Sequence, residues 1–434
     1  MNELRKTDMG NAERLVQEYG HVIRWDGKKW WLWSGQQWLP GGDSMVEKLA
    51  KDTVKRLREI DTEWAFKSES AHRIKSMIHL AKSEVPINVE QFDQKDMLLN
   101  CANGTMDLQN LTFRKEHKPD HYFTRITPAE FDPTYILPEW NEYLKSVTDN
   151  DETLIAYLQQ IAGLSLIGGS YERGMYIIFG PKASGKSTFV EALAAALGPF
   201  GVTVRFKATF GRKKGDTDLT PAIARLRGYR LVVANEVPKN LQVETDVFKL
   251  YTSGDTIDAR GLYQDYSNFR ATGTLILVCN DLPQFEITDQ ALWDRVKVVE
   301  FPLSIPKEKQ NRELRPMLQN PDVGGKAILA WAAQGLKRYR EAKTLQEPQC
   351  VVEWTAKHQK EQNPVVCWLE ECVQFGDFWT SFAQLYTSYG AWCRSENEEE
   401  MSEKEFSQFI QGQKGVTRVK HKERGFHGLH LSAS

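Results

Sequence analysis

Nine consecutive residues, Gly180-Pro-Lys-Ala-Ser-Gly-Lys-Ser-Thr188, constrain the fold of this chain more than any other part of its sequence. They match in full the pattern of a glycine, four residues of any type, and then glycine, lysine and serine or threonine. A short apolar run, Met175–Phe179, precedes them, and a helical pattern at residues 189–197 follows. A strand that passes through such a loop into a helix points backbone N–H groups and the positive helix end at one place, where phosphate groups bind. The sequence therefore predicts a nucleotide-binding α/β core.

Two side chains of this loop have chemistry that is specific to nucleoside triphosphates. We expect Lys186 to contact the β- and γ-phosphates of ATP and the Ser187 hydroxyl to be a ligand of Mg²⁺. A glycine-rich turn without function would not need the strand before it and the helix after it. The candidate nucleotide-binding residues are Gly180, Pro181, Lys182, Ala183, Ser184, Gly185, Lys186, Ser187 and Thr188.

Around this loop, from about residue 146 to residue 345, short apolar runs alternate with helical patterns. Runs rich in valine, isoleucine and leucine are typical of parallel strands that are buried on both faces. The alternation of strands and helices predicts an α/β domain with a parallel sheet. The predicted strands are residues 175–179, 230–234, 274–279 and 296–301.

Three polar residues downstream of the loop are candidates for hydrolytic chemistry. Glu236 ends one apolar run and is placed to polarise an attacking water or to share in holding Mg²⁺. Asn280 ends the next run and is suited to orient that water. Arg295 has the forked donors that can neutralise transition-state charge from a neighbouring subunit. Each residue alone could be a strand end or a surface cation, but their order after the loop favours an ATP-hydrolysing site.

The length and composition of the chain restrict its class. A chain of 434 residues is too long for one core, and two or three domains are expected. The sequence has no apolar run of about 18 residues and no apolar signal segment, so we expect no membrane span and a cytoplasmic location. Its six cysteines form no Cys-x-x-Cys pair, which argues against structural zinc and disulfides. A net charge of −2 neither favours nor excludes nucleic acid.

The first 145 residues open with a tryptophan-rich hairpin whose turn is Asp26-Gly27. Aromatic side chains next to Lys28 and Lys29 could stack on nucleic-acid bases. The alternative is that they form the core of a small sheet, which we favour because tryptophan side chains bury large areas. The tryptophans are Trp25, Trp30, Trp31, Trp33 and Trp38.

The last part of the chain, after Pro348, has the pattern of helices followed by a basic hairpin. Helices are expected around residues 365–375 and 382–392. Ser402 is expected to cap a further helix, because Glu405 follows three residues later. Residues 416–431 then alternate as the strands of a hairpin do. This order predicts a winged helix-turn-helix domain.

Taken in order, the loop, the run ending in Glu236, Asn280 and Arg295 resemble the superfamily 3 helicases of the AAA+ class. The chain is most similar to the phage and plasmid primase-helicases of the poxvirus D5 and phage P4 type. Residues 99–108, Phe131-Asp-Pro and Pro138-Glu-Trp140 resemble the domain that precedes the helicase in that family. Two further segments carry the resemblance downstream, at residues 248–260 and 385–393.

The resemblance implies an AAA+ P-loop ATPase core between a mixed α+β N-terminal domain and a C-terminal winged-helix domain. The implied limits are residues 1–145, 146–345 and 346–434. The implied activity is ATP-dependent translocation of a homo-hexameric ring, 3′ to 5′, on single-stranded and forked DNA during replication of a phage, plasmid or mobile element. ATP would lie between subunits, with Arg295 reaching across from the next one, and a separate primase or polymerase would be a further partner.

The resemblance also implies that residues 258–269 form a hairpin that lines the ring channel. Lys249, Arg260 and Tyr263 are the candidate DNA-binding residues, and packing or salt bridges between subunits are the alternative for the two cations. Two departures stand out: Asn235 occupies the place where many P-loop ATPases have aspartate, and we find no carboxylates for a primase. The chain is therefore expected to be a helicase without a primase, or a fragment of a longer protein.

Two other functions remain open from the sequence. An AAA+ origin-binding initiator or remodelling ATPase would use the same ATP site without processive unwinding. A P-loop small-molecule kinase would act as a monomer on an added acceptor. Asn280, Arg295 and the size of the flanking domains argue against the kinase.

Overall fold

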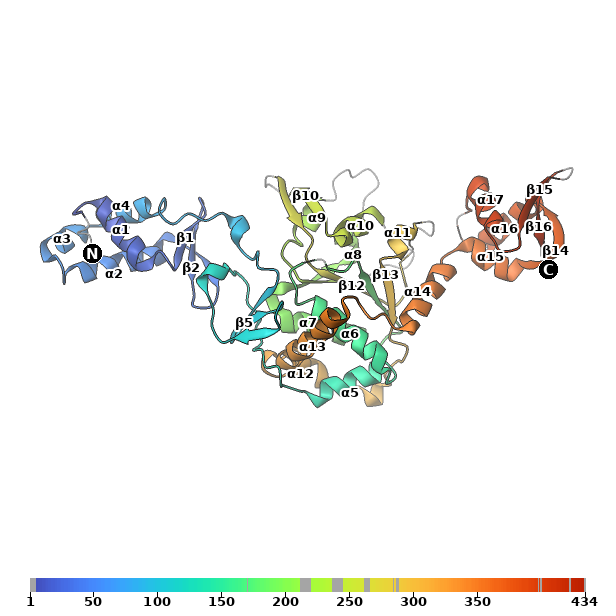
Figure 1. Cartoon of the computed structure of the whole chain (residues 1–434), viewed down its shortest axis with the longest axis horizontal. Coiled ribbons are helices and arrows are strands. Elements are labelled where there is room, and N and C mark those ends of the chain that lie inside the picture. The colour runs from blue at the N-terminus through green and yellow to red at the C-terminus, as the bar shows by residue number, and fades with distance from the viewer. Residues whose placement is uncertain are drawn as a thin grey trace.

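A computed structural model describes residues 5–169, 171–210, 220–235, 245–260, 266–283, 285, 289–396, 398, 400–420 and 423–432. Figure 1 shows an elongated molecule with a central α/β lobe between two smaller lobes, and with the two termini at opposite ends. In the parts of the chain given above, no helix is long and apolar enough to cross a membrane. All six cysteines are free.

The centre of the molecule is a sheet of five strands that all run parallel, in the order β13-β7-β12-β9-β8. The predicted α/β class with a parallel sheet is confirmed, and each of the four predicted strands is present. The fifth, β8, was not predicted. It lies at the edge of the sheet, and its residues are exposed or half-buried, so it has no continuous apolar run. The strands are β7 (Met175–Phe179), β8 (Gly201–Arg205), β9 (Leu231–Asn235), β12 (Thr274–Cys279) and β13 (Val296–Glu300).

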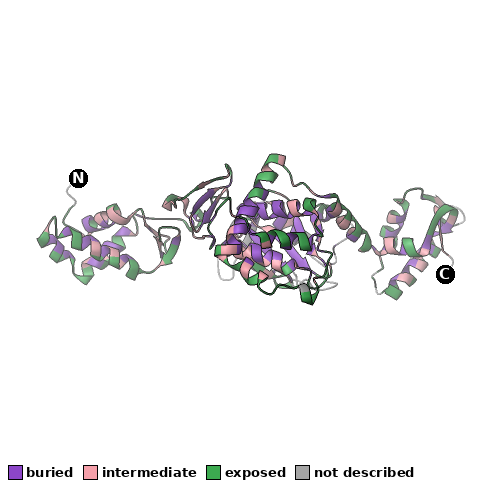
Figure 2. Ribbon diagram, turned by 90° about the horizontal axis from the view of Figure 1, so that it is seen from below, coloured by how far each residue is buried: buried purple, intermediate pink, exposed green. Residues whose placement is uncertain are grey.

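Both faces of this sheet are covered, which explains why its central strands are apolar throughout. Successive side chains of β7 point to opposite faces: Tyr176 and Ile178 join one buried cluster, and Met175 and Ile177 join the other. Buried positions are concentrated in this lobe (Figure 2). The first cluster is completed by helices α6 (Glu152–Leu164), α7 (Lys186–Leu197) and α13 (Lys326–Ala342).

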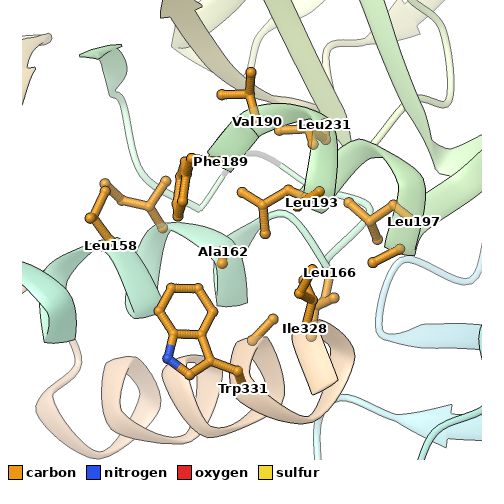
Figure 3. Packing of buried hydrophobic residues seen from close by; sticks show 14 of the residues in the cluster. Leu158, Ala162, Leu166, Phe189, Val190, Leu193, Leu197, Leu231, Ile328 and Trp331 are labelled. Atoms are coloured by element: carbon orange, nitrogen blue, oxygen red, sulfur yellow. The ribbon is translucent and has the colours of Figure 1, made fainter. Parts of the chain in front are cut away.

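The cluster between these three helices fixes the position of α7, the helix that follows the glycine-rich loop. Phe189 and Leu193 of α7 meet Leu158 of α6 and Trp331 of α13 (Figure 3). Each of these four side chains is less than 10% exposed. Full burial of one such side chain stabilises the fold by about 1.5–3 kcal/mol. The first turns of α7 are therefore held in place by buried contacts with α6 and α13.

The N-terminal lobe holds the predicted tryptophan-rich hairpin, but its turn comprises residues 26–29 and not Asp26-Gly27 alone, since the Asp26 N–H donates to the Lys29 carbonyl oxygen (3.2 Å). Trp25 pairs with Trp30, and the Asp26 carboxylate accepts hydrogen bonds from the backbone N–H groups of Lys28 and Lys29 within the turn. A third strand extends the hairpin into a sheet, and helices pack on it. The elements are α1 (Asp8–Tyr19), β1 (Ile23–Trp25), β2 (Trp30–Trp33), β3 (Trp38–Gly41), α2 (Asp43–Leu57), α3 (Thr62–Ser68) and α4 (Ala71–Ala81).

The tryptophans of this hairpin are mainly core residues. Trp30 and Trp38 are 1% and 0% exposed, which confirms the packing interpretation for these two. The other three are half-buried. Cations of the same chain already occupy two of the rings: Lys29 Nζ lies 4.5 Å from the centre of Trp31, and Lys82 Nζ lies 3.9 Å from that of Trp25.

The chain then enters the central lobe through a small antiparallel sheet and helix α5 (Pro138–Val147). Leu99 and Met106 of this sheet, and Trp140 of α5, belong to the same buried cluster as α6 and α7. The predicted boundary between residues 145 and 146 falls within α5, and the three domain limits stay predictions. The small sheet is formed by β4 (Leu98–Cys101), β5 (Gly104–Asp107) and β6 (Thr112–Arg114).

The C-terminal lobe has its own core, built by Trp368, Tyr389 and Phe406 among others. The predicted cap is confirmed, because Ser402 and Glu405 form a reciprocal capping box. The helix expected to reach residue 375 ends at Cys372, since Val373 already has extended backbone and starts a strand. The winged-helix assignment stays a prediction. The elements are α14 (Gln349–Glu361), α15 (Pro364–Cys372), β14 (Val373–Ser381), α16 (Phe382–Glu396), α17 (Glu403–Gln411), β15 (Thr417–Lys420) and β16 (Arg424–Leu431).

Candidate nucleotide-binding site

The glycine-rich loop lies at the end of the central sheet where the parallel strands terminate, which we call its carboxyl edge. Strand β12 lies between β7 and β9 and runs parallel to both. Parallel strands end on the same edge, so the residues that follow β7, β12 and β9 are neighbours. Ligands of open α/β sheets bind at this edge. Gly180, Asn280 and Asn235 therefore come together although they are far apart in the sequence.

A pocket of about 510 Å³ opens between these residues. Its volume lies within the range of about 300–1,000 Å³ that is usual for ligand sites. Seven of the nine predicted loop residues, 182–188, line it, and so does Asn280. The sequence did not identify Val278 and Cys279 as lining residues. The full lining is Lys182, Ala183, Ser184, Gly185, Lys186, Ser187, Thr188, Asn235, Val278, Cys279 and Asn280.

The backbone of the loop has a shape that depends on its glycines. Gly180 has a φ of 148°, and a Cβ atom there would lie 2.3 Å from the carbonyl oxygen of Phe301. Gly185 has a φ of 93° and is the N-cap of α7. The middle of the loop is held by the segment that follows β13, where the Ile305 N–H donates a hydrogen bond to the Ala183 carbonyl oxygen (2.9 Å). The loop is thus curled and anchored by the protein itself.

Lys186 is folded back over this loop. Its ammonium group donates to the carbonyl oxygens of Gly180 and Pro181, both at 2.7 Å, and to the hydroxyl of Ser184 at 3.1 Å. The residue is 6% exposed, and burial lowers the pKa of its ammonium. The three partners are neutral, so they solvate the charge without cancelling it. Such an ammonium can attract the phosphates of a nucleotide that enters the pocket.

Two strand-end residues complete the pocket edge. Asn280 follows β12 and is exposed to the pocket, and Asn235 is the last residue of β9. Cys279 is buried, and burial raises the pKa of its thiol to about 12, so it is not a nucleophile. From the sequence, Asn235 stood out only as a departure from aspartate. The sequence signal that could have identified Asn235 as a pocket residue is its position at the end of a predicted parallel strand.

The predicted site residues also include Glu236, Tyr263 and Arg260. Glu236 and Tyr263 lie outside the residues that the structure describes. Arg260 ends strand β10 (Thr256–Arg260), which pairs antiparallel with β11 (Tyr266–Arg270), so the strands of the predicted hairpin are present. The roles of Glu236, Tyr263 and Arg260 stay predictions.

Lys249 has partners within its own chain. It lies on α10 (Thr245–Ser253), where its ammonium is 2.7 Å from a carboxylate oxygen of Asp289 and 3.2 Å from one of Asp246. Hydrogen bonds to these carboxylates raise the pKa of Lys249. These ion pairs lie within one chain and not between subunits, and DNA contact by Lys249 stays a prediction.

Arg295 lies at the end of the sheet where the parallel strands begin, its amino edge, whereas the pocket lies at the end where they terminate. It immediately precedes β13, whose first residue, Val296, is level with Met175 at the start of β7. The five residues of β7 separate that level from the loop, a length of about 16 Å. The Arg295 guanidinium donates to the carbonyl oxygen of Ala291 (2.9 Å). Within one chain, the structure brings together the loop, Asn235 and Asn280, but not Arg295.

Comparison with solved structures finds the apo structure of the NrS-1 C-terminal region. The alignment covers 98% of this chain and 100% of that chain, with 12% sequence identity and a TM-score of 0.49.

Comparison with known sequences identifies viral relatives. The chain is 27% identical over 222 residues to “Putative helicase L207/L206” of Acanthamoeba polyphaga mimivirus, covering 50% of this chain and 23% of that protein. It is 24% identical over 264 residues to “Putative helicase 121R” of Invertebrate iridescent virus 3, covering 57% and 28%. It is 26% identical over 219 residues to “Uncoating factor OPG117” of Vaccinia virus, covering 47% and 27%. The matched regions span about a quarter of these relatives' own length.

The family comparison concerns the N-terminal third. Residues 12–149 match the family described as D5 N terminal like, a segment that runs from α1 through α5. Together with the viral relatives, this match supports the resemblance of the chain to the D5-type helicase family.

Proposed function

We propose that this protein is an ATP-dependent DNA helicase with an AAA+ core, which moves 3′ to 5′ along single-stranded DNA as a hexameric ring. The observation that carries the proposal is the pocket at the carboxyl edge of the sheet, where Lys186 and Asn280 meet. Relatives that are named as helicases support the motor over a kinase. The proposed role is replication of a viral, phage or plasmid element in the host cytoplasm.

The residues of the pocket suit the chemistry of ATP hydrolysis. The N–H groups at the start of α7 and the Lys186 ammonium are donors for the phosphate oxygens. The Ser187 hydroxyl and Glu236 would hold Mg²⁺, which neutralises phosphate charge when bound. We assign Asn280 to orient the attacking water and Glu236 to polarise it. Lys186 and Ser187 follow β7 and Asn280 follows β12, so one end of the sheet supplies these three groups, and Glu236 follows β9 in the sequence.

The position of Arg295 supports an assembly of several copies. An arginine at the amino edge of the sheet is too far from its own pocket to contact the γ-phosphate. A neighbouring copy that presents its amino edge to this pocket would bring its own Arg295 to the phosphate. Such a contact joins two different surfaces, and repeated around an axis it closes into a ring. A homo-hexamer is the ring that we propose.

We propose that DNA passes through this ring past the β10–β11 hairpin. Lys249, Arg260 and Tyr263 are the proposed contacts, and phosphate neutralisation by the two cations would make binding salt-dependent. The C-terminal lobe, as a winged helix, is proposed to contact forked DNA or a separate primase or polymerase.

ATP turnover by this protein should rise several-fold when single-stranded DNA is added, because a motor couples hydrolysis to its track. The measurement is phosphate release with and without an oligonucleotide, combined with the mass of the assembly in solution. Turnover that ignores DNA would favour an origin-binding initiator or remodelling ATPase. A stable monomer with full ATPase activity would contradict the role of Arg295 between subunits.

A further inference from the structure

Helix α5 lies directly against the glycine-rich loop, and the proposed chemistry does not use it. Trp140, Tyr143 and Val147 are three and four residues apart, so they share one face of the helix. The Trp140 ring stacks on Phe189 of α7, with 5.9 Å between ring centres and 10° between planes. At Gly185, a Cβ atom would lie 2.6 Å from Val147. This face of α5 therefore packs against the first turn of α7.

One polar contact joins the two segments. The Tyr143 hydroxyl donates a hydrogen bond to the carbonyl oxygen of Gly185, at 2.8 Å. Tyr143 is 4% exposed, and burial raises the pKa of its hydroxyl above the ordinary value, so the group keeps its proton and donates. The same carbonyl oxygen accepts the first helical hydrogen bond, from the Phe189 N–H at 3.1 Å. Both acceptor positions of Gly185 are thus filled.

This carbonyl belongs to the peptide unit that also carries the N–H of Lys186. A peptide unit is planar and trans, so its C=O and N–H point to opposite sides. A carbonyl held toward α5 directs the Lys186 N–H away from α5. That N–H is in the first turn of α7, where it has no partner within the helix. Gly185 and Lys186 both line the pocket.

We propose that Tyr143 is a positioning residue of the nucleotide site, whose hydroxyl orients the Gly185–Lys186 peptide so that the Lys186 N–H faces the phosphates. The inference rests on the proposed ATP site. It also gives the D5 N-terminal-like segment a task, because residues 12–149 include α5. That segment packs behind the phosphate-binding loop, and the Tyr143 hydroxyl is its hydrogen-bond contact with the loop.

The test is the affinity of the full chain for Mg·ADP, measured by titration for the wild type and for Tyr143→Phe. Phenylalanine keeps the ring and its packing on Trp140 and removes only the donor. Without the donor, nucleotide binding must itself restore the orientation of the Gly185–Lys186 peptide, so Kd should rise by up to about three- to tenfold, the equivalent of one neutral hydrogen bond. The thermal midpoint of the nucleotide-free protein should change little, because the Gly185 carbonyl keeps its bond from Phe189.

The matched control is Tyr157→Phe on α6. Tyr157 is 1% exposed, and its hydroxyl has no hydrogen-bond partner among the described residues, so its loss should leave the Kd unchanged. Equal Kd values for wild type and Tyr143→Phe, with Lys186→Ala unable to bind, would overturn the role of Tyr143 alone. A lower thermal midpoint with an unchanged Kd would also overturn it, since the tyrosine would then be structural. No binding of Mg·ADP by the wild type would overturn the nucleotide site itself.

Discussion

Replacement of Lys186 by alanine is expected to abolish ATP turnover, a fall of about a thousandfold or more. Two lysines of the loop line the pocket, Lys182 and Lys186, and of these two the Lys186 ammonium is the buried one, with neutral hydrogen-bond partners. Its loss removes the main counter-charge of the phosphates both in the bound state and in the transition state. The measurement is steady-state phosphate release, with nucleotide binding measured alongside.

A matched control separates this effect from the loss of any lysine. Lys337→Ala on α13 changes a side chain that is 65% exposed, lies 4.0 Å from Glu341 and is not among the residues that line the pocket. Its turnover should equal that of the wild type. Retained turnover in Lys186→Ala would show that the loop is not the hydrolytic site.

Replacement of Arg295 by alanine is expected to lower hydrolysis by about a thousandfold while nucleotide binding stays nearly intact. In one chain the arginine is separated from the loop by the length of β7, so its removal cannot disturb its own pocket directly. It would act on the transition state in the pocket of a neighbouring copy. The measurement is kcat for ATP beside the Kd for Mg·ADP.

Mixing experiments test whether Arg295 acts between subunits. Small amounts of Arg295→Ala added to the wild type should inhibit more strongly than dilution, because one defective copy interrupts a ring. Arg58→Ala, an exposed arginine of the N-terminal lobe that pairs with Glu69, is the control and should only dilute. Inhibition by Arg295→Ala that follows simple dilution would place its function within one chain.

The fold of the central lobe was predictable from the sequence where burial is complete. Strands such as β7 and β12 are covered on both faces and therefore read as unbroken apolar runs. Strand β8 has no such run, because it is the outermost strand of the sheet and its residues are exposed or half-buried. Residues 373–375 were predicted as helix, because the apolar pattern of α15 continues into β14 and periodicity alone does not mark where the backbone changes.

The tryptophan hairpin shows why burial itself was not predictable. Its strands and turn follow from local sequence, but the partners of its rings come from elsewhere in the chain. Trp38 packs against Phe92 and Tyr122, with ring centres 6.5 and 6.1 Å apart. No local pattern identifies these partners, so the sequence favoured core packing on the size of the side chains alone, with base stacking as the alternative.

The nucleotide site was predictable in its loop and at Asn280, because parallel strands must end on one edge. The position of Arg295 at the other edge follows from the same rule, since it precedes its strand. Tyr143 was not predictable. Its contact with Gly185 joins residues 42 positions apart and depends on how α5 packs on α7.

Unwinding of a forked DNA duplex with ATP and Mg²⁺ is the measurement that decides whether this protein is a helicase. We expect strand separation that requires a 3′ single-stranded tail and disappears in Lys186→Ala. ATP hydrolysis that is independent of DNA, without strand separation on any fork, would contradict the helicase and favour an initiator or remodelling ATPase built on the same site.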